Sequence, residues 1–307
     1  MQQPTPQVIQ KPMSKSAQNA IQEASQTINT TLISKSLKSA DYNPTHEAML
    51  ARTLERIAIK KGQELRTPDE LWIVDHNDVY TLGQAGKEEH ILQHTDTPII
   101  KTDRGGQVTW HGHGQLVIYL LFDLHSLGWS VRNLVSHAEQ AIEDVVNHCL
   151  NSHLSSSSAN ISAHARRDAP GVYLYSDYNH AHVDEVDLPA NDDVNNNVSN
   201  DHDNDSAIML GKIASLGFKI KHGFSYHGIA LNLNCDLAAF NAINPCGYAG
   251  MQMLRLADFI SMNEKEDKQV SELLSYEQIT QKLIDNIAQR HAGLIELRPV
   301  APKAPKV

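Results

Sequence analysis

Cys246 stands in the segment INPCGYAGM and Lys212 in KIASLG, with the glycine- and histidine-bearing stretch HGFSYHGIALN between them. The thiolate is the reactive form of a cysteine, and a nearby cation stabilises it. A thiol activated in this way can attack an acyl carbonyl and form a thioester. The pair therefore predicts acyl transfer through a covalent intermediate on Cys246.

Each residue of this pair also has an ordinary structural explanation. A lysine at the start of a strand is usually solvated, and a single cysteine is usually a buried, unreactive side chain. The Asn-Pro-Cys-Gly context of Cys246 instead indicates a loop that presents the thiol. Cys149 lies late in an expected helix, and Cys235 lies beside Asp236, whose charge disfavours a thiolate. We expect these two cysteines to be structural.

A second candidate for chemistry is the segment RGGQVTWHGHGQ, which runs from Arg104 to Gln115. Its four glycines allow positive φ angles and let backbone N–H groups approach a ligand closely. Arg104 offers a charged, planar guanidinium with several N–H donors, and His111 offers a switchable hydrogen-bond donor or acceptor. Two tight turns with solvated polar residues would explain the same composition. The segment contains neither the phosphate-binding GxxxxGK[ST] pattern nor a dinucleotide-binding glycine pattern.

Two further segments combine small residues with expected strands. They are Ser215, Leu216 and Gly217, shortly after Lys212, and Gly228, Ile229 and Ala230 in the stretch that follows. Small side chains leave space beside a strand, and an apolar space of this kind can hold an acyl chain. Each segment by itself is a weak signal.

The histidines do not indicate a metal site. Three of them (His180, His182 and His202) lie in an acidic, Asn-rich stretch where no fixed scaffold is expected. The others near the candidate segments lack the HExxH spacing or the cysteine pairs of zinc sites; they are His111, His222 and His227. We expect no metal and no cofactor.

The hydrophobic pattern predicts the elements that position these residues. Helices are expected over residues 45–62 and 130–150, with Thr45 and Ser130 as caps, over 237–243 with Asp236 as cap, and over most of the chain after Leu254. Strands are expected over 71–75 and 79–82, joined by an Asn-Asp turn, and over 98–101, 107–110, 116–123, 171–175, 213–221 and 229–234. The run 116–123 is apolar throughout, which is typical of a strand covered on both faces.

Strands in mixed order with two main helices favour an α+β fold, with mixed β-sheets and helices covering one face. Residues 1–40 are polar and are expected to be a disordered extension. A catalytic domain over 41–262 would contain a disordered acidic insertion over about 177–205. A helical segment and tail would follow over 263–307.

The chain has 307 residues and a formal net charge of −10, and it contains three cysteines. Nine acidic residues lie between Asp177 and Asp205 without any Lys or Arg, so the remainder is close to neutral and nucleic acid is not an expected partner. An odd, sparse cysteine count fits a reducing compartment. The longest apolar run is too short for a membrane span, and the N-terminus lacks a secretory pattern. We therefore expect a cytoplasmic protein that does not bind membranes.

Taken together, the segments RGGQVTWHGHGQ, ARRDAPGVYL, KIASLG, HGFSYHGIALN and INPCGYAGM resemble the lipoyl(octanoyl) transferases. The usual forms in that family are RGGxVTYHGPGQ, KIAxxG, HGxALN and PCG. The resemblance extends from about Leu71 to Met251, in the family order. Trp110 replaces the common Tyr, and His113 replaces the common Pro, which could loosen the turn.

The resemblance implies the fold of biotin and lipoate protein ligases and the transfer of octanoyl from octanoyl-acyl carrier protein to a lysine of a lipoyl domain. The acceptors would be the lipoyl domains of 2-oxoacid dehydrogenases and the glycine cleavage H protein. Cys246 would be the nucleophile, and Lys212 would favour its thiolate. The substrate would be bound by Arg104, Gly105, Gly106, Gln107, Val108, Thr109, Trp110, His111, Ser215, Leu216, Gly217, Gly228, Ile229 and Ala230.

Two alternatives share some of these features. An ATP-dependent lipoate or biotin ligase would have the same fold, but it has no need of the thiol in PCG. A non-catalytic binding module would not need both Lys212 and Cys246. An acidic carrier would need a basic landing patch, for which the candidates are Lys101, Arg104, Arg166, Arg167, Lys219 and Lys221.

Overall fold

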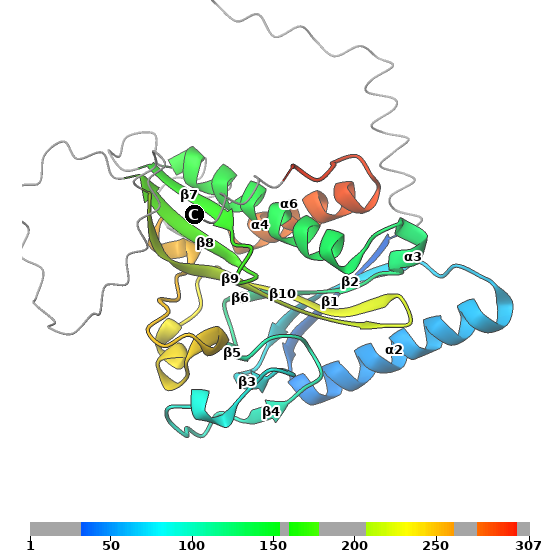
Figure 1. Ribbon diagram of the computed structural model, residues 1–307, viewed down its shortest axis with the longest axis horizontal. Helices are drawn as coiled ribbons and strands as arrows, with labels where there is room; N and C mark the ends of the chain where they lie inside the picture. Colours follow the sequence, from blue (N-terminus) through cyan, green and yellow to red (C-terminus); the bar gives the residue numbers. More distant parts are fainter. Residues whose placement is uncertain (1–31, 154–159, 178–206, 261–274, 300–307) are drawn as a thin grey trace, which may run out of the picture.

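The computed structural model describes residues 32–153, 160–177, 207–260 and 275–299 (Figure 1). A seven-stranded mixed sheet has the order β1-β2-β6-β10-β9-β8-β7, and a three-stranded sheet has the order β4-β3-β5. The strands are β1 (Leu32–Ala40), β2 (Asp69–His76), β3 (Val79–Leu82), β4 (Ile99–Lys101), β5 (Val108–His111), β6 (Gln115–Leu121), β7 (Asn160–Ala165), β8 (Val172–Asp177), β9 (Ala207–Lys221) and β10 (Phe224–Asn232). The α-helices are α2 (Tyr42–Gln63), α3 (Leu124–Leu127), α4 (Val131–His153) and α6 (Tyr276–His291).

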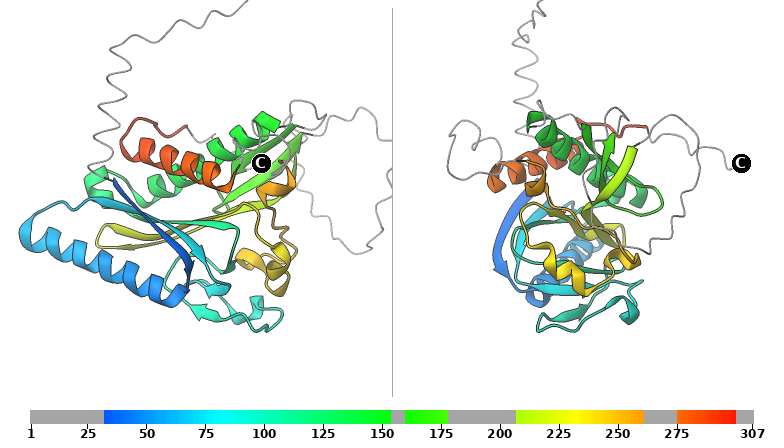
Figure 2. Two further views of the ribbon diagram at one scale, coloured as in Figure 1. Left: turned by 180° about the vertical axis from the view of Figure 1, so that it is seen from behind. Right: turned by 90° about the vertical axis from the view of Figure 1, so that its left-hand side faces the viewer.

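Helices cover both faces of the large sheet, which differs from the expected single covered face. On one face α4 and α6 bury a cluster that contains Leu116 and Ile118 of β6. On the other face α2 inserts Met49 among Val117 and Tyr119 of the same strand. Figure 2 shows α2 on the side of the sheet away from α4 and α6. All seven residues of β6 are buried, as a continuous apolar strand predicts.

The helix α4 begins where the sequence indicates. The Ser130 hydroxyl accepts a hydrogen bond from the Asn133 amide at 3.1 Å, and the Asn133 side chain accepts one from the Ser130 amide at 3.0 Å. This reciprocal cap satisfies backbone donors that the first helical turn leaves free. The predicted α+β class, with mixed sheets and covering helices, is confirmed.

The N-terminal prediction is wrong for residues 32–40. These nine residues form β1, which pairs in parallel with β2. Leu37 and Ala40 pack against the α2-side cluster, so two apolar anchors suffice at the edge of an existing sheet. Residues 1–31, 154–159, 178–206, 261–274 and 300–307 lie outside the described part of the chain, so the disordered segments expected within 1–31 and 178–206 are not tested.

The sheet topology adds two points to the sequence predictions. The strands expected on either side of the Asn-Asp turn form as β2 and β3, but β2 belongs to the large sheet and β3 to the small one. The turn therefore carries the chain from one sheet to the other. The strand β7 was not predicted from the sequence, and it pairs with β8. None of the described helices is both long and apolar enough to cross a bilayer.

Candidate active site

The structure brings Cys246 and Lys212 into direct contact. The Lys212 ammonium lies 3.0 Å from the Cys246 sulfur and also donates to the carbonyl of Pro170 at 2.9 Å. Cys246 sits in the short turn Pro245–Gly247 with a φ of 58°, a left-handed conformation that few non-glycine residues adopt. The turn is therefore shaped to present the thiol. Cys149 and Cys235 are both buried, and burial raises their pKa values, to about 11 and about 12.

A β-bulge turns Lys212 towards this turn. Val172 of β8 pairs with Ala214 and Tyr173 pairs with Lys212, so Ile213 is an extra residue on β9. Ile213 and Ala214 both belong to the core cluster under α4 and α6. Side chains otherwise alternate along a strand, and the bulge resets that alternation. As a result Lys212 points to the same face as Ser215, away from the core where regular alternation would have placed it.

A cavity of about 430 Å³ adjoins the pair. Its walls include Lys212 and Cys246, and its volume lies within the range of small-molecule binding sites. All but one of the substrate-binding residues expected from the sequence line it, namely Arg104, Gly105, Gly106, Gln107, Val108, Thr109, His111, Ser215, Leu216, Gly217, Gly228, Ile229 and Ala230.

Trp110 is the exception, and the prediction for it is wrong. Its side chain packs edge-on against Phe240, with ring centroids 5.5 Å apart, and it does not line the cavity. Trp110 is buried in the cluster beneath the small sheet. Successive residues of a strand point to opposite faces, so a contiguous motif cannot direct every side chain into one cavity.

The glycines keep the walls close together. Gly217 pairs with Gly228 across β9 and β10. A Cβ on Gly217 would lie 2.9 Å from the carbonyl oxygen of Gly105, and one on Gly228 would overlap the carbonyl of Ile118. The Gly105 amide donates to the carbonyl of Phe218 at 3.1 Å. The loop that contains Arg104 therefore lies flat against the sheet because these positions lack side chains.

Arg104 is buried, so it is not part of a surface landing patch. Its guanidinium donates to the Thr81 carbonyl at 2.6 Å and to that of Gln107 at 2.8 Å. Burial lowers its pKa, and a charge on Cys246 would oppose that effect. Arg104 therefore holds the loop in shape and adds positive potential on the cavity side. Among the other patch candidates, Lys101 pairs with Glu88 and Arg166 pairs with Asp168.

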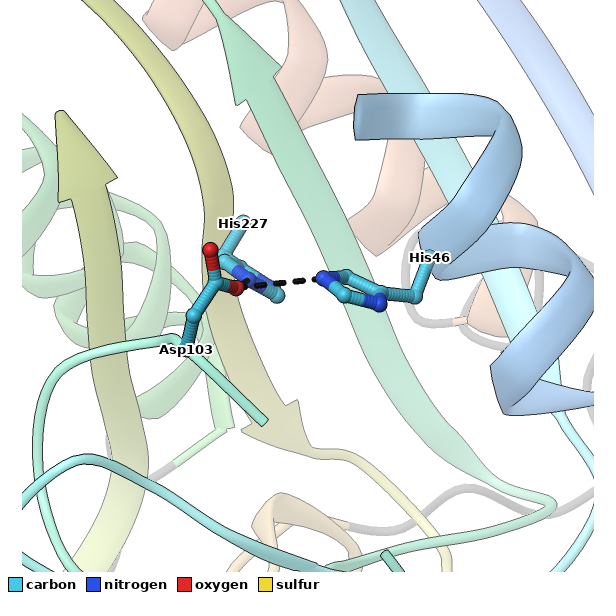
Figure 3. Close-up of side chains that lie close together, drawn as sticks. All are labelled: His46, Asp103 and His227. Atoms are coloured by element: carbon cyan, nitrogen blue, oxygen red, sulfur yellow. Dashed lines mark hydrogen bonds and ion pairs between the residues drawn. The ribbon is translucent and has the colours of Figure 1, made fainter. Parts of the chain in front are cut away.

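Asp103, the residue before Arg104, was not identified from the sequence. Figure 3 shows its carboxylate between His46 of α2 and His227 of β10. It accepts hydrogen bonds from the Nε2 atoms of these histidines at 3.1 and 2.9 Å, and a third from the Tyr226 hydroxyl. The bond from His227 is the main cause that lowers the pKa of Asp103. The carboxylate ties the loop to two distant elements.

The same three side chains, His46, Asp103 and His227, have the atom types and spacing that could hold a metal ion. A histidine that binds a metal usually donates its other ring N–H to an acceptor. The Nδ1 of His227 is buried and has no partner within the described chain. Burial also lowers the pKa of His227, which favours a neutral ring with its proton on Nε2, facing Asp103. The hydrogen bonds from His46 and His227 to Asp103 account for the close grouping of these three side chains.

Aromatic and histidine rings close another part of the cavity. Tyr42 and His111 stack with centroids 6.3 Å apart, and Tyr119 bonds to His76 at 2.7 Å. Burial is the main cause that lowers the pKa of His111 to about 3, so this ring is neutral at physiological pH. A neutral imidazole has one donor and one acceptor nitrogen, and the two ring nitrogens of His111 contact the side chains of Gln115 and Thr81. Tyr42 and Tyr119 line the cavity, although no sequence motif indicated them.

Comparison with known proteins places this site in a family. The lipoyl protein ligase A/B catalytic domain matches residues 47–287. A protein named octanoyltransferase from Psychrobacter arcticus is 68% identical over 292 residues, which cover 91% of this chain and 96% of that protein. The octanoyltransferase of Acinetobacter baylyi is 39% identical over 81% of this chain and 93% of its own length.

The chain belongs to the lipoyl(octanoyl) transferase family. It is therefore an acyltransferase, and the matched catalytic domain confirms the expected lipoate protein ligase fold. A solved bipartite lipoate protein ligase from Thermoplasma acidophilum is 12% identical, covers 87% of this chain and 86% of that one, and has a TM-score of 0.44. Within this transferase the contact between Lys212 and Cys246 has the geometry that a thiol-activating pair requires.

Proposed function

We propose that this transferase moves an octanoyl group from octanoyl-acyl carrier protein to a lysine of a lipoyl domain, through a thioester on Cys246. This would be the first step of lipoyl cofactor assembly. The observation that carries the proposal is the 3.0 Å contact between the Lys212 ammonium and the Cys246 sulfur in the wall of the cavity. Octanoyl is proposed as the acyl group because the curated relatives are named octanoyltransferase.

In the first half-reaction the Cys246 thiolate attacks the carbonyl carbon of the carrier thioester. The bond between that carbon and the carrier sulfur breaks, and the carrier leaves as a thiol after taking a proton from the Lys212 ammonium, which becomes a neutral amine. One thioester replaces another, so little driving force is needed. The octanoyl chain would lie in the cavity, where each buried methylene contributes roughly 0.8 kcal/mol.

In the second half-reaction the neutral amine of the acceptor lysine attacks the acyl-enzyme. The amide C–N bond forms, the bond to Cys246 breaks, and the amine's proton returns to the pair of Cys246 and Lys212. His111 is a poor acceptor for this proton because its pKa is lowered to about 3. Lys212, which contacts the sulfur, is therefore the proposed proton relay.

The amide product is more stable than the thioester, so the proposed reaction needs no ATP. An adenylating ligase would need no thiol at the position of Cys246, and the engagement of that thiol by Lys212 favours the transferase. The proposed acceptors are the lipoyl domains of 2-oxoacid dehydrogenases and the glycine cleavage H protein. A cytoplasmic location belongs to the same proposal, since the three cysteines are free.

Intact-protein mass spectrometry after mixing with octanoyl-acyl carrier protein tests the covalent step. We expect the wild-type chain to gain the mass of one octanoyl group and Cys246→Ala to gain none. Cys235→Ala is the matched control, because Cys235 is buried and lies outside the cavity lining. It should acylate like the wild type. An octanoyl adduct on Cys246→Ala would show that the nucleophile lies elsewhere.

A further inference from the structure

Lys212 is a cation held away from water. Its side chain is only 1% exposed, and its Nζ contacts the Pro170 carbonyl and the Cys246 sulfur and lies 5.3 Å from the centre of the Tyr173 ring. The carbonyl and the ring carry no net charge. A buried cation without a counter-charge is driven to lose its proton, and a neutral amine would stabilise a thiolate poorly. The arrangement therefore needs an anion that is present before Cys246 ionises.

The backbone of Pro170 and Gly171 packs closely against this lysine. A Cβ on Gly171 would overlap Cε of Lys212 and lie 2.8 Å from its Nζ. The Gly171 φ of 143° is also one that side chains rarely adopt. The amide of Gly171 donates to Oε1 of Glu139 at 3.0 Å. Glu139 therefore fixes the peptide whose carbonyl holds the lysine.

Glu139 lies on α4, and its carboxyl is buried. Burial is the main cause that raises its pKa to about 7. The hydrogen bond from the Gly171 amide lowers this pKa, the like charge of Glu143 raises it, and the positive charge of Lys212 lowers it. The neighbouring acids are engaged elsewhere, since Glu143 pairs with Arg298 at 2.6 Å and Asp168 with Arg166 at 2.5 Å. No ion pair joins Glu139 to another described residue. Its charge is therefore available to Lys212.

We propose that Glu139 is a positioning residue that fixes the Pro170–Gly171 backbone around Lys212 and places a negative charge near the ammonium that contacts Cys246. The proposal rests on the proposed role of Cys246 as the nucleophile. Glu139 contacts neither the thiol nor the cavity, so it acts through Lys212. Its hydrogen bond sets the geometry of the peptide, and its negative charge attracts the Lys212 ammonium.

Glu139→Gln separates these two contributions, because glutamine keeps an oxygen for the Gly171 amide but has no charge. The rate of Cys246 alkylation by iodoacetamide, measured on the Cys246 peptide from about pH 6 to pH 9, reports the thiolate. We expect the variant to react about fivefold more slowly near pH 7.5. The difference in alkylation rate between the variant and the wild type should become smaller near pH 6, where wild-type Glu139 is itself protonated.

Glu139→Gln should fold. The raised pKa means that the folded state binds this proton more tightly than the unfolded chain, whose pKa for Glu is 4.5. Wild-type stability is therefore lost as pH rises from 4.5 through about 7, and an uncharged glutamine avoids that loss. The melting temperature of the variant at pH 8 should equal or exceed that of the wild type. Glu143→Gln, one turn along α4, is the matched control; it should alkylate no more slowly than the wild type, because removing its like charge favours the ionised form of Glu139.

A wild-type alkylation profile in Glu139→Gln would overturn the proposal. So would a slowing that is equal at every pH, because that is the result of altered packing. Glu139→Ala, which also loses the hydrogen bond, should be slower than the glutamine variant at all pH values. Alkylation needs no acyl donor, so this test is independent of the octanoyl reaction. If wild-type Cys246 fails to acylate, the proposed function fails while the alkylation data still decide the role of Glu139.

Discussion

The chemistry of the site depends on how closely a few atoms pack. Lys212 reaches the Cys246 sulfur only because Gly171 has no side chain and because the bulge at Ile213 turns the lysine away from the core. The neighbouring carbonyl of Pro170 accepts a hydrogen bond from the ammonium. Each of these features fixes the ammonium at one place, and fixed charges are what make an active-site cation effective.

Gly171→Ala tests this packing directly. The added methyl group would occupy the place of Lys212 Cε, so the lysine must move away from the sulfur. We expect the acylation rate to fall by about a hundredfold and the free energy of unfolding to fall by about 1–3 kcal/mol. Single-turnover acylation and urea unfolding would measure the two effects. Gly62→Ala, where a methyl group meets nothing within 4 Å, is the control, and equal activity of both variants would refute the packing argument.

Sequence motifs identified the residues that touch the reacting groups more readily than the residues behind them. Cys246 and Lys212 follow from residue type and the family pattern, and the structure adds their contact. Glu139 reads as one more polar position on a helix, because its bond to Gly171 joins segments that are distant in sequence. The bulge at Ile213 likewise depends on the pairing of β8 with β9, which local sequence does not encode.

At the scale of elements, the loop between β4 and β5 is the part of the site that needs the most external support. It carries Arg104, Gly105 and Gly106 into the cavity wall. Asp103 joins it to α2 through His46 and to β10 through His227. The loop thus connects the small sheet to the large one, and its position depends on all three elements.

Asp103→Asn should loosen this loop. Hydrogen bonds, chiefly from His227, lower the pKa of Asp103, so its ionised form contributes stability above the ordinary pKa of 3.8 that is lost as pH falls below it. The side chain is 36% exposed, so after allowance for solvent screening we expect a cost of about 1 kcal/mol at pH 7. The difference from the wild type should shrink below about pH 4 in urea titrations.

A matched control for this prediction is Asp75→Asn. Asp75 also pairs with a histidine, His113, but that histidine is 60% exposed on the surface. Its replacement should change stability by less than about 0.5 kcal/mol. If Asp75→Asn and Asp103→Asn lowered stability equally, the hydrogen bonds of Asp103 to His46 and His227 would contribute no more to stability than an ordinary surface pair.

Element prediction from sequence worked best for segments with strong periodic or continuous apolar patterns. The strand β6 and the helix α4 lie close to their predicted ranges, because burial dictates their residues. The edge strand β1 was missed, because a strand with one partner needs few apolar side chains. The assignment of β2 and β3 to different sheets depends on long-range pairing, which a turn dipeptide cannot report.

At the scale of the whole molecule, the acidic stretch dominates the net charge without belonging to the described core. Residues 178–206 contain eight acidic residues and no Lys or Arg, so the chain without them would carry a charge of −2 instead of −10. Asp177 of β8 and Ala207 of β9 are paired, so the two ends of the stretch already lie side by side. A two-residue Asn-Gly turn could therefore join the strands without changing their register.

We expect this hairpin variant, with residues 178–206 replaced by Asn-Gly, to keep kcat within about twofold of the wild type. Ala207 is five residues from Lys212 along β9, roughly 16 Å, so the new turn lies away from the pair. The proposed acyl carrier is acidic, so removal of eight like charges should raise kcat/KM about two- to fivefold at low salt and have little effect at high salt. Steady-state transfer assays at two ionic strengths measure this. A kcat lower by more than about tenfold would show that the stretch takes part in turnover, and a gain that persisted at high salt would rule out charge repulsion as its cause.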